Sequence, residues 1–325
     1  MRGMRLPLRR RPLFAAGAVA VCAITAAAAA PAYAGPVAPA VHPTASPNAR
    51  VSGNSVAGTL TGTAARRAAG PAVADFLREH RQLVANTHAG KNVTPDGQLH
   101  AWWGSFPDTN SGTAVIATQS ISQTLRLSNK RDILYAPTMT PADNSCIEVV
   151  TVHTTKTPQI WAWDWCDKIA PVAVVPVTPA FMARYTAIIN GRTSYTTEDV
   201  QTNAGKNTWT ARLFNYQTGS WDTLWTQSGK DKSGLTFGWD MFEFYSLTNK
   251  ATGNTYVCGD LQHAGTQIES SSISIRRGST WHLAGPSNSS WNPEAKPDPS
   301  AYRCPDMQFN IVQDNSAWMV DVAGS

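Results

Sequence analysis

A glutamate among aromatic residues is the strongest candidate for chemistry in this sequence. The segment Phe237–Tyr245 alternates, so Glu243 shares one face with aromatic side chains and Asp240 points to the other. Burial among apolar rings raises the pKa of a carboxyl and equips it to act as a general acid. The alternative is a hydrogen-bonded structural glutamate. Hydrolysis of a glycosidic bond needs a second carboxyl group, for which Asp164, Asp222 and Asp240 are the candidates.

Tryptophan is concentrated in the middle of the chain, where seven of the twelve fall between Trp161 and Trp239. In Gln159–Cys166, alternation places three indoles on one face. They belong to Trp161, Trp163 and Trp165. Same-face residues of a strand repeat at about 6.6 Å, a spacing that suits stacking beneath successive rings of an extended glycan. Three indoles on one face can equally form the core of a sandwich, and both interpretations stay open at this point.

A predicted hairpin supplies further candidates for a binding face. Its strands are Thr208–Tyr216 and Trp221–Gln227, and Arg212 and Asp222 lie there among aromatic residues. These two can bind a polar ligand or form a cross-strand ion pair, and we favour the ion pair. The side chains expected to contact a ligand are Trp161, Trp163, Trp165, Trp209, Arg212, Trp221, Trp239 and Glu243, with Asp164 and Asp222 as further hydrogen-bonding groups.

The N-terminus has the pattern of an export signal. Five arginines and no acidic residue precede an apolar stretch from Leu13 to Ala30, and Ala32-Tyr33-Ala34 follows it. This order of basic, apolar and small residues is typical of a secretory signal peptide over residues 1–34, cleaved after Ala34. No later stretch has the length of a membrane-spanning helix. We therefore expect a secreted, extracellular protein.

The same segment holds the excess positive charge of the chain. The whole sequence has 27 Lys+Arg and 22 Asp+Glu, and removal of the five arginines of residues 1–34 leaves 22 of each sign. A mature protein of zero formal net charge gives no electrostatic reason to bind nucleic acid or an anionic membrane surface. Arg10-Arg11 leaves twin-arginine export open, a route that indicates a bacterial source.

Four cysteines remain outside the export signal. An even number of cysteines in an exported chain indicates two disulfides. Sequence proximity favours Cys146–Cys166 and Cys258–Cys304, although three pairings are possible. No C-x-x-C or H-E-x-x-H occurs and the histidines are scattered, so no metal site and no cofactor is predicted.

The rest of the chain divides by composition into three parts. Residues 35–70 are rich in Ala, Pro, Gly, Ser and Thr without periodicity, so we expect a disordered leader. Residues 71–89 repeat apolar side chains at helical spacing, which predicts one N-terminal helix. Residues 97–325 alternate with period two between turn residues. They predict one all-β domain, a two-sheet antiparallel β-sandwich of the concanavalin A-like or jelly-roll type.

The predicted strands are Ala114–Gln119, Gln123–Leu127, Cys146–His153, Gln159–Cys166, Ala183–Asn190, Tyr195–Gln201, Thr208–Tyr216, Trp221–Gln227, Phe237–Tyr245, Gln267–Ile275, Met307–Gln313 and Ala317–Val322.

Part of this strand order resembles the eqolisin glutamic peptidases. The resemblance rests on the stretch from Cys146 to Trp165, the turn at Gln217-Thr218-Gly219 and the strand carrying Glu243. Members of that family are secreted lectin-like sandwiches, so the resemblance implies the concanavalin A-like fold. Their catalysis rests on a glutamine on the strand after a cysteine and a glutamate on a later strand. The corresponding positions fall near Val152 and Trp239, which lack the amide and the carboxyl. The resemblance therefore favours the fold and not the peptidase activity.

Binding of a carbohydrate through an aromatic-lined sheet face is the function that the sequence favours. The expected partner is a polysaccharide or another glycan. One alternative is an enzyme with Glu243 as acid or base, either a glycan hydrolase or lyase or a diverged peptidase. The other is a structural or interaction protein of the cell surface whose aromatic residues are all core. The sequence leaves open whether the protein is an enzyme.

Overall fold

The structure is a computed structural model that describes residues 44–70, 73, 91–93, 97–108, 112–142 and 144–323. The predicted signal peptide over residues 1–34 lies outside these residues, as does the predicted helix over residues 71–89 apart from Val73. Both stay predictions. Among the described residues, no helix combines the length and the apolar character needed to cross a bilayer.

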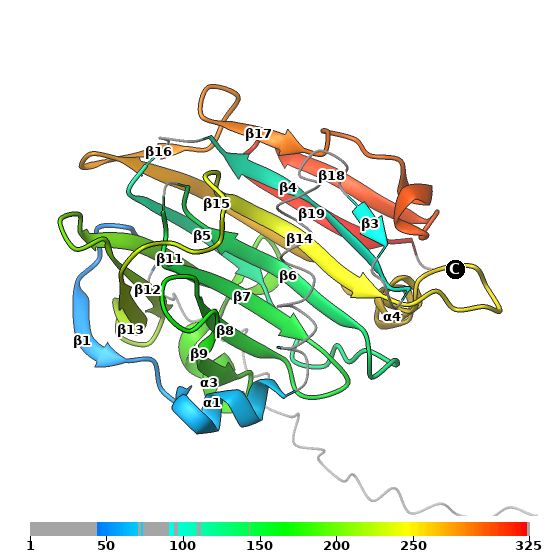
Figure 1. The fold of residues 1–325 in the computed structure, drawn as a ribbon, viewed down its shortest axis with the longest axis horizontal. Helices are drawn as coiled ribbons and strands as arrows, with labels where there is room; N and C mark the ends of the chain where they lie inside the picture. The colour runs from blue at the N-terminus through cyan, green and yellow to red at the C-terminus, as the bar shows by residue number, and fades with distance from the viewer. Residues whose placement is uncertain are drawn as a thin grey trace, which may run out of the picture. The chain divides into compact units, whose positions relative to one another are not determined.

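Two β-sheets form the molecule (Figure 1). One is a ten-stranded sheet with the order β1-β13-β12-β11-β5-β15-β19-β18, to which β10 and β16 add at β11 and β15. Its strands are β1 (Val51–Ser55), β5 (Ala114–Ser120), β10 (Ala187–Ile189), β11 (Arg192–Asn203), β12 (Thr208–Asn215), β13 (Ser220–Ser228), β15 (Ile268–Arg277), β16 (Thr280–Leu283), β18 (Met307–Gln313) and β19 (Ala317–Val322).

The other is a nine-stranded sheet with the order β17-β4-β14-β6-β7-β8-β9-β2, to which β3 adds at β4. Its strands are β2 (Leu60–Thr61), β3 (Lys91–Val93), β4 (Leu99–Pro107), β6 (Ile133–Thr140), β7 (Ile147–His153), β8 (Gln159–Asp164), β9 (Ala170–Pro176), β14 (Trp239–Ser246) and β17 (Ser289–Asn292). Neighbouring strands in both sheets are antiparallel, except for the parallel pair of β1 and β13. The predicted all-β antiparallel sandwich is confirmed.

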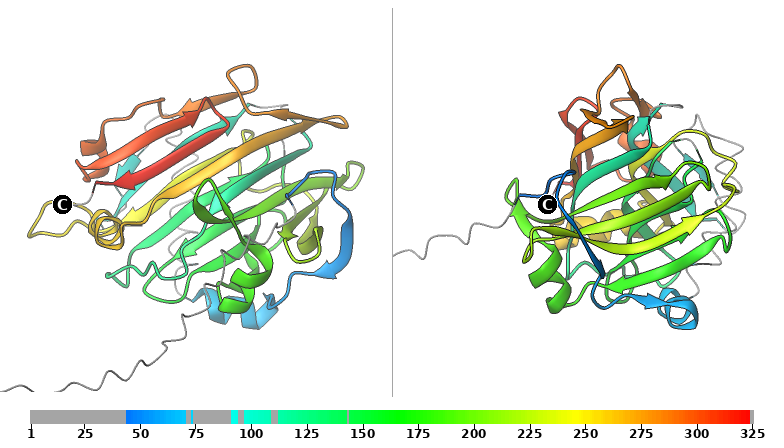
Figure 2. Two further views of the ribbon diagram at one scale, coloured as in Figure 1. Left: turned by 180° about the vertical axis from the view of Figure 1, so that it is seen from behind. Right: turned by 90° about the vertical axis from the view of Figure 1, so that its left-hand side faces the viewer.

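The two sheets lie one on the other as layers (Figure 2). Two apolar clusters fill the space between them. In the first, Trp103 and Phe242 of the nine-stranded sheet meet Trp318 of the ten-stranded sheet. In the second, Ile160 meets Trp209 in the same way. Both clusters draw on both sheets, so the opposite face of the nine-stranded sheet points away from the sandwich interior and is called the outer face below.

Two further clusters lie on this outer face. One contains the indoles of Trp161, Trp163 and Trp165 and is covered by the helix α1 (Gly62–Ala69) through Ala65 and Ala69. The other, called here the Trp102 cluster, consists of Trp102, Phe106, Leu235, Trp239 and Met241, with Phe237 packed against it. The outer face is therefore apolar at both ends.

Tertiary contacts hold α1 in place. Its N-cap Thr61 makes no side-chain capping bond, and an isolated helix of eight residues is marginal in water. Its stability comes instead from the burial of Ala65 and Ala69 and from Gln159, whose Nε2 donates to the Ala68 carbonyl at 3.1 Å. Two other helices, α3 (Pro179–Tyr185) and α4 (Tyr256–Ala264), begin after Thr178 and Thr255, whose hydroxyls accept from the first turn.

The structure corrects three expectations from the sequence. The leader predicted as disordered over residues 35–70 contains β1, β2 and α1, because β1 pairs with β13 and β2 pairs with β9. The strand predicted over Ala183–Asn190 is the end of α3 followed by β10. The segment Gln123–Leu127 belongs to no strand. Neighbouring elements decided each of these outcomes, and local composition does not show them.

Both predicted disulfides are present. Cys146 is bonded to Cys166 and Cys258 to Cys304, with Cα–Cα distances of 5.0 and 5.4 Å. Two disulfides are compatible with an extracellular protein.

Candidate acid–base site

Glu243 lies on the outer face, as the alternation of its strand predicts. Its neighbours Phe242 and Phe244 belong to the interior cluster, and Tyr245 belongs to the cluster beneath α1. The pairing of β14 with β6 shifts register between Met241 and Glu243. The extra residue of this irregularity lies in β6, so β14 keeps its alternation.

Three groups meet around the Glu243 carboxyl. His100 Nε2 shares a hydrogen bond with Glu243 Oε1 at 2.7 Å, and the Tyr245 hydroxyl donates to the same oxygen at 3.0 Å. The rings of His100 and Tyr245 stack, with centroids 4.0 Å apart. Glu243 is 1% exposed. Burial raises the pKa of Glu243 to about 8, against the smaller lowering by the Tyr245 hydrogen bond.

A second buried glutamate, Glu148 on β7, belongs to the same group. It is 1% exposed, and its carboxyl accepts from the indoles of Trp239 and Trp165, each at 3.1 Å, and from the Thr138 hydroxyl. Burial, followed by the negative charge of Glu243, raises the pKa of Glu148 to about 8. Because the charge of Glu243 contributes to the raised pKa of Glu148, the two carboxyls are electrostatic neighbours, and β6 lies between their strands.

The two carboxyls occupy the middle of the outer face, between its two apolar clusters. Glu148 contacts Trp239 of the Trp102 cluster, and Glu243 contacts Tyr245 of the cluster beneath α1. With pKa values near 8, both groups hold a proton at neutral pH. A carboxylic acid that stays neutral at pH 7 can donate a proton to a leaving group. Once one of them is ionised, it can act as a base.

Asp164, predicted as a partner of Glu243, caps a turn instead. Its carboxyl accepts from the backbone amides of Cys166, Asp167 and Lys168 at 2.8, 3.0 and 3.0 Å. It also accepts from Gln227 Nε2 at 2.8 Å. These bonds hold the chain as it leaves β8, so Asp164 has a structural role in this arrangement.

Asp222 and Arg212 do not form the ion pair expected between them. Arg212 Nη1 bonds Glu198 Oε1 at 2.6 Å, because the register of β11 and β12 places these two residues directly opposite each other, whereas Asp222 lies opposite Leu213. The Asp222 carboxyl accepts from Ser52 at 2.6 Å, Tyr185 at 2.9 Å and Asn215 at 2.8 Å. Asp222 thus lies far from the outer face, in the network that fixes β1 and α3 to β13.

Asp240 lies between the sheets, as the alternation of β14 predicts. Its carboxyl accepts from Gln119 Nε2 at 3.1 Å and Trp318 Nε1 at 2.8 Å. Tyr195 in turn donates to Gln119 Oε1 at 2.5 Å. This network joins the two sheets and does not reach Glu243.

The predicted tryptophan row exists and is buried. Trp161, Trp163 and Trp165 share the outer face, with at most 1% of each residue exposed beside α1. Trp209 lies in the interior, and Trp221 packs on the far side of the ten-stranded sheet. The burial matches the core interpretation of these indoles, and their contact with a ligand stays a prediction.

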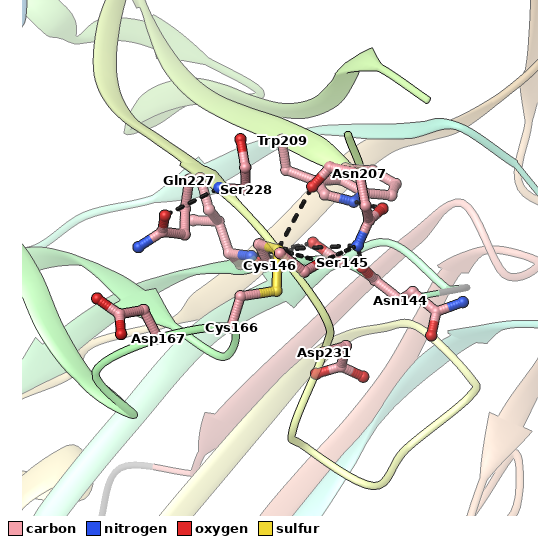
Figure 3. Close-up of a disulfide and its surroundings, with 12 residues drawn as sticks. Asn144, Ser145, Cys146, Cys166, Asp167, Asn207, Trp209, Gln227, Ser228 and Asp231 are labelled. Atoms are coloured by element: carbon pink, nitrogen blue, oxygen red, sulfur yellow. Dashed lines mark hydrogen bonds between the residues drawn. A yellow bond between two sulfur atoms is a disulfide. The ribbon is translucent and has the colours of Figure 1, made fainter. Parts of the chain in front are cut away.

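Figure 3 shows the Cys146–Cys166 disulfide, in which Cys146 directly precedes β7, the strand that carries Glu148. It joins the chain just before β7 to the chain just after β8, and the Trp165 amide donates to the Cys146 carbonyl at 2.8 Å. This bracing holds the Trp165 indole where it reaches Glu148. On the other side of the disulfide, the Asn207 amide group bonds the carbonyls of Asn144 and Gly229, at 2.9 and 2.7 Å.

Sequence reasoning missed Glu148 and His100. Each lies in a mostly apolar strand, Glu148 in Ile147–His153, which also contains His153, and His100 in Leu99–Pro107, and these strands are buried along their whole length. Glutamate is almost never fully buried without a partner. An ionisable residue within such a strand is the signal that could have indicated both.

Comparisons with known proteins give only loose matches. Neither a protein-family model nor a curated protein sequence matches the chain. Among solved structures, scytalido-glutamic peptidase with a transition state analog inhibitor covers 68% of this chain and 98% of its own, at 10% identity and a TM-score of 0.40. SCP-B, a member of the eqolisin family of peptidases in complex with a tripeptide, covers the same shares at 11% identity and a TM-score of 0.35. The resemblance noted in the sequence thus has a loose structural counterpart, which assigns no activity to this chain.

Proposed function

We propose that this protein is a hydrolase of glycosidic bonds, with Glu243 and Glu148 as its acid–base pair. The observation that supports it is the pair itself: two buried carboxyls on one face, each with its pKa raised to about 8 chiefly by burial, with the charge of Glu243 adding to the rise at Glu148. Glycoside hydrolysis requires two carboxyl groups on either side of the scissile bond. Neither Asp164 nor Asp222 offers a second group beside Glu243.

The proposed roles follow from the contacts. Glu243 donates its proton to the leaving oxygen, and the Tyr245 hydroxyl and His100 stabilise the carboxylate that results. Glu148, once ionised, takes a proton from the water whose oxygen bonds to the anomeric carbon as the glycosidic bond breaks, and two indole donors stabilise its ionised form. Both side chains are 1% exposed, so a polymer reaches them only when the outer face opens.

The test is a turnover assay of the full chain with its disulfides intact. Soluble and insoluble polysaccharides are incubated with the protein and reducing ends are measured, with casein hydrolysis followed in parallel. Glu243→Gln and Glu148→Gln should each lower turnover by about 100-fold or more. Glu294→Gln is the matched control, because Glu294 lies outside the pair and accepts from the Trp103 indole through its backbone carbonyl, which the substitution keeps.

Each outcome of this assay decides something. Release of reducing ends by the unsubstituted protein, and its loss in Glu243→Gln, would support the proposal. Peptide release without sugar release reassigns the pair to a peptidase. If a folded sample gives no product, the hydrolase proposal is wrong and glycan binding without catalysis becomes the favoured function. Binding without turnover is the second candidate function, favoured by a cavity beside Trp161 with a mixed polar and apolar lining. Its test is glycan retention by Trp163→Ala, provided that the variant folds.

A further inference from the structure

A cavity of about 200 Å³ opens at one end of the outer face, beside the turn between β7 and β8. Its apolar lining comes from Ile133, Val152 and Trp161, and α1 adds Ala69. Its rim carries two lysines, Lys130 and Lys156, on two separate turns. The cavity therefore combines an apolar lining with positive charge at the entrance.

Hydrogen bonds fix the wall of this cavity. The Trp161 indole donates to Gln159 Oε1 at 2.6 Å, and Gln159 Nε2 donates to the Ala68 carbonyl at 3.1 Å. One glutamine thus connects the indole to α1, with both ends of its amide in use. The shape is set by partners within the protein and does not depend on a ligand.

The charge at the entrance favours an anion. In the described part of the chain, neither Lys130 nor Lys156 takes part in an ion pair. The one carboxyl in the lining, that of Asp132, accepts from the Ser246 hydroxyl and, at 3.0 Å, from the Leu247 amide. Its two oxygens are occupied within the protein, whereas both ammonium groups are exposed.

An aromatic path connects this cavity with the acid–base pair. The ring of Trp161 meets that of Tyr135 at 6.0 Å, and Tyr135 meets Tyr245 at 5.9 Å. The Tyr245 hydroxyl donates to Glu243. A ligand in the cavity therefore occupies the same outer face as Glu243, a few side chains away across the strands from β8 to β14.

We propose that the cavity is a subsite for an acidic sugar, with Lys130 and Lys156 pairing with the carboxylate of a uronic acid unit and the apolar lining supporting its ring. The inference rests on the proposed glycan function, because it assigns the substrate of that site to the acidic glycans. Exposed threonine hydroxyls of the β7–β8 turn, those of Thr155 and Thr157, are placed to bond ring hydroxyls.

The experiment compares two sugars that differ in the carboxylate. Binding of D-galacturonate and of D-galactose to the full chain is measured by calorimetry at low and at physiological salt. We expect galacturonate to bind at least tenfold more tightly, and to bind more weakly as salt screens the lysines. Equal affinities for the two sugars, or no binding of galacturonate, would overturn the proposal.

Variants place the effect at the cavity. Lys130→Gln with Lys156→Gln should weaken galacturonate binding by roughly tenfold and leave galactose unchanged. The matched control removes two other exposed lysines, Lys206 and Lys230, and should change nothing. The indole N–H resonance of Trp161, assigned with Trp161→Phe, should shift on titration. A loss shared by both double variants would contradict a specific subsite.

The experiments distinguish failure of the subsite proposal from failure of the hydrolase proposal. Galacturonate binding is measured again in Glu243→Gln, whose pair cannot turn over but whose cavity is intact. Retained binding in Glu243→Gln, together with no product from any polysaccharide in the unsubstituted protein, would keep the acidic-sugar subsite and remove the hydrolase. Product from neutral polysaccharides only would do the reverse.

Discussion

Strand β14 places two buried carboxyls three residues apart on opposite faces, and their surroundings differ. Asp240 lies between the sheets and accepts from Gln119 and Trp318, and burial raises its pKa to about 6 against several hydrogen bonds that lower it. Glu243 lies on the outer face, where its pKa is raised to about 8. Its charge also opposes ionisation of Glu148.

The exposed fractions of the two are alike, so burial alone does not separate a structural carboxyl from one suited to proton transfer. Asp240 meets only donors, which favour its ionised form. Glu243 shares its face with another carboxyl, and two such groups cannot both ionise cheaply. Perturbed pairs of this kind concentrate at functional sites. The sign of the neighbouring groups is therefore what marks the outer pair as the candidate site.

Removing Asp240 should give the largest effect. At pH 7 Asp240→Ala leaves the Gln119 amide without its carboxylate acceptor and the Trp318 indole with only the backbone carbonyl of residue 240. We expect a loss of about 3–5 kcal/mol in the free energy of unfolding, measured by urea denaturation, because each hydrogen bond to the ionised carboxyl contributes about 1.5–3 kcal/mol. Glu243→Gln is the control, since an amide replaces a protonated acid of nearly the same shape, and should change stability by less than about 1 kcal/mol. Equal losses in the two variants would remove the distinction between the carboxyls.

The alternation of apolar and polar residues in the sequence predicted several strands and the faces on which Asp240 and Glu243 lie. Met307–Gln313 and Ala317–Val322 are strands with the predicted bounds, and β14 has the predicted faces. Strand β6 was missed, since it is buried throughout and contains Pro137. Because β6 lies between β7 and β14, the neighbourhood of Glu148 and Glu243 could not be predicted without it. Pairings between strands distant in sequence decide such neighbourhoods, and one strand's pattern does not contain them.

The dependence of stability on pH should separate the two faces by a smaller amount. The folded protein keeps protons on Glu148 and Glu243 up to about pH 8. The unfolded chain releases them at about pH 4.3, because that is the ordinary pKa of a glutamate side chain. The folded state thus binds more protons in this window, so stability falls as pH rises through it. Protonation of Asp240 also makes stability fall as pH rises, but this effect ends near pH 6, where the folded protein releases the Asp240 proton.

Between pH 6 and pH 8 the outer pair should therefore dominate the slope. We expect the free energy of unfolding to fall there by up to about 2.7 kcal/mol per pH unit, about 1.4 from each glutamate that is protonated in the folded state and ionised in the unfolded chain. Urea denaturation across this range measures it. In Glu148→Gln with Glu243→Gln the slope should flatten, and a slope that persists in that variant would show that the pair does not titrate as proposed.

The two disulfides offer the finest distinction, because both lie in interior clusters but only one adjoins the site. Cys146 directly precedes the strand of Glu148 and Cys166 directly follows Trp165, whose indole donates to Glu148, whereas Cys258 and Cys304 lie in the cluster that contains Trp318. Replacing either pair by alanine removes a constraint on the unfolded chain and should cost about 3–4 kcal/mol. Only the first should admit water to Glu148 and lower its pKa, by roughly one unit. Carbon NMR titration of the glutamate carboxyls measures this shift, and a pKa that moves equally in both variants would show that the Cys146–Cys166 bridge has no specific part in holding the site.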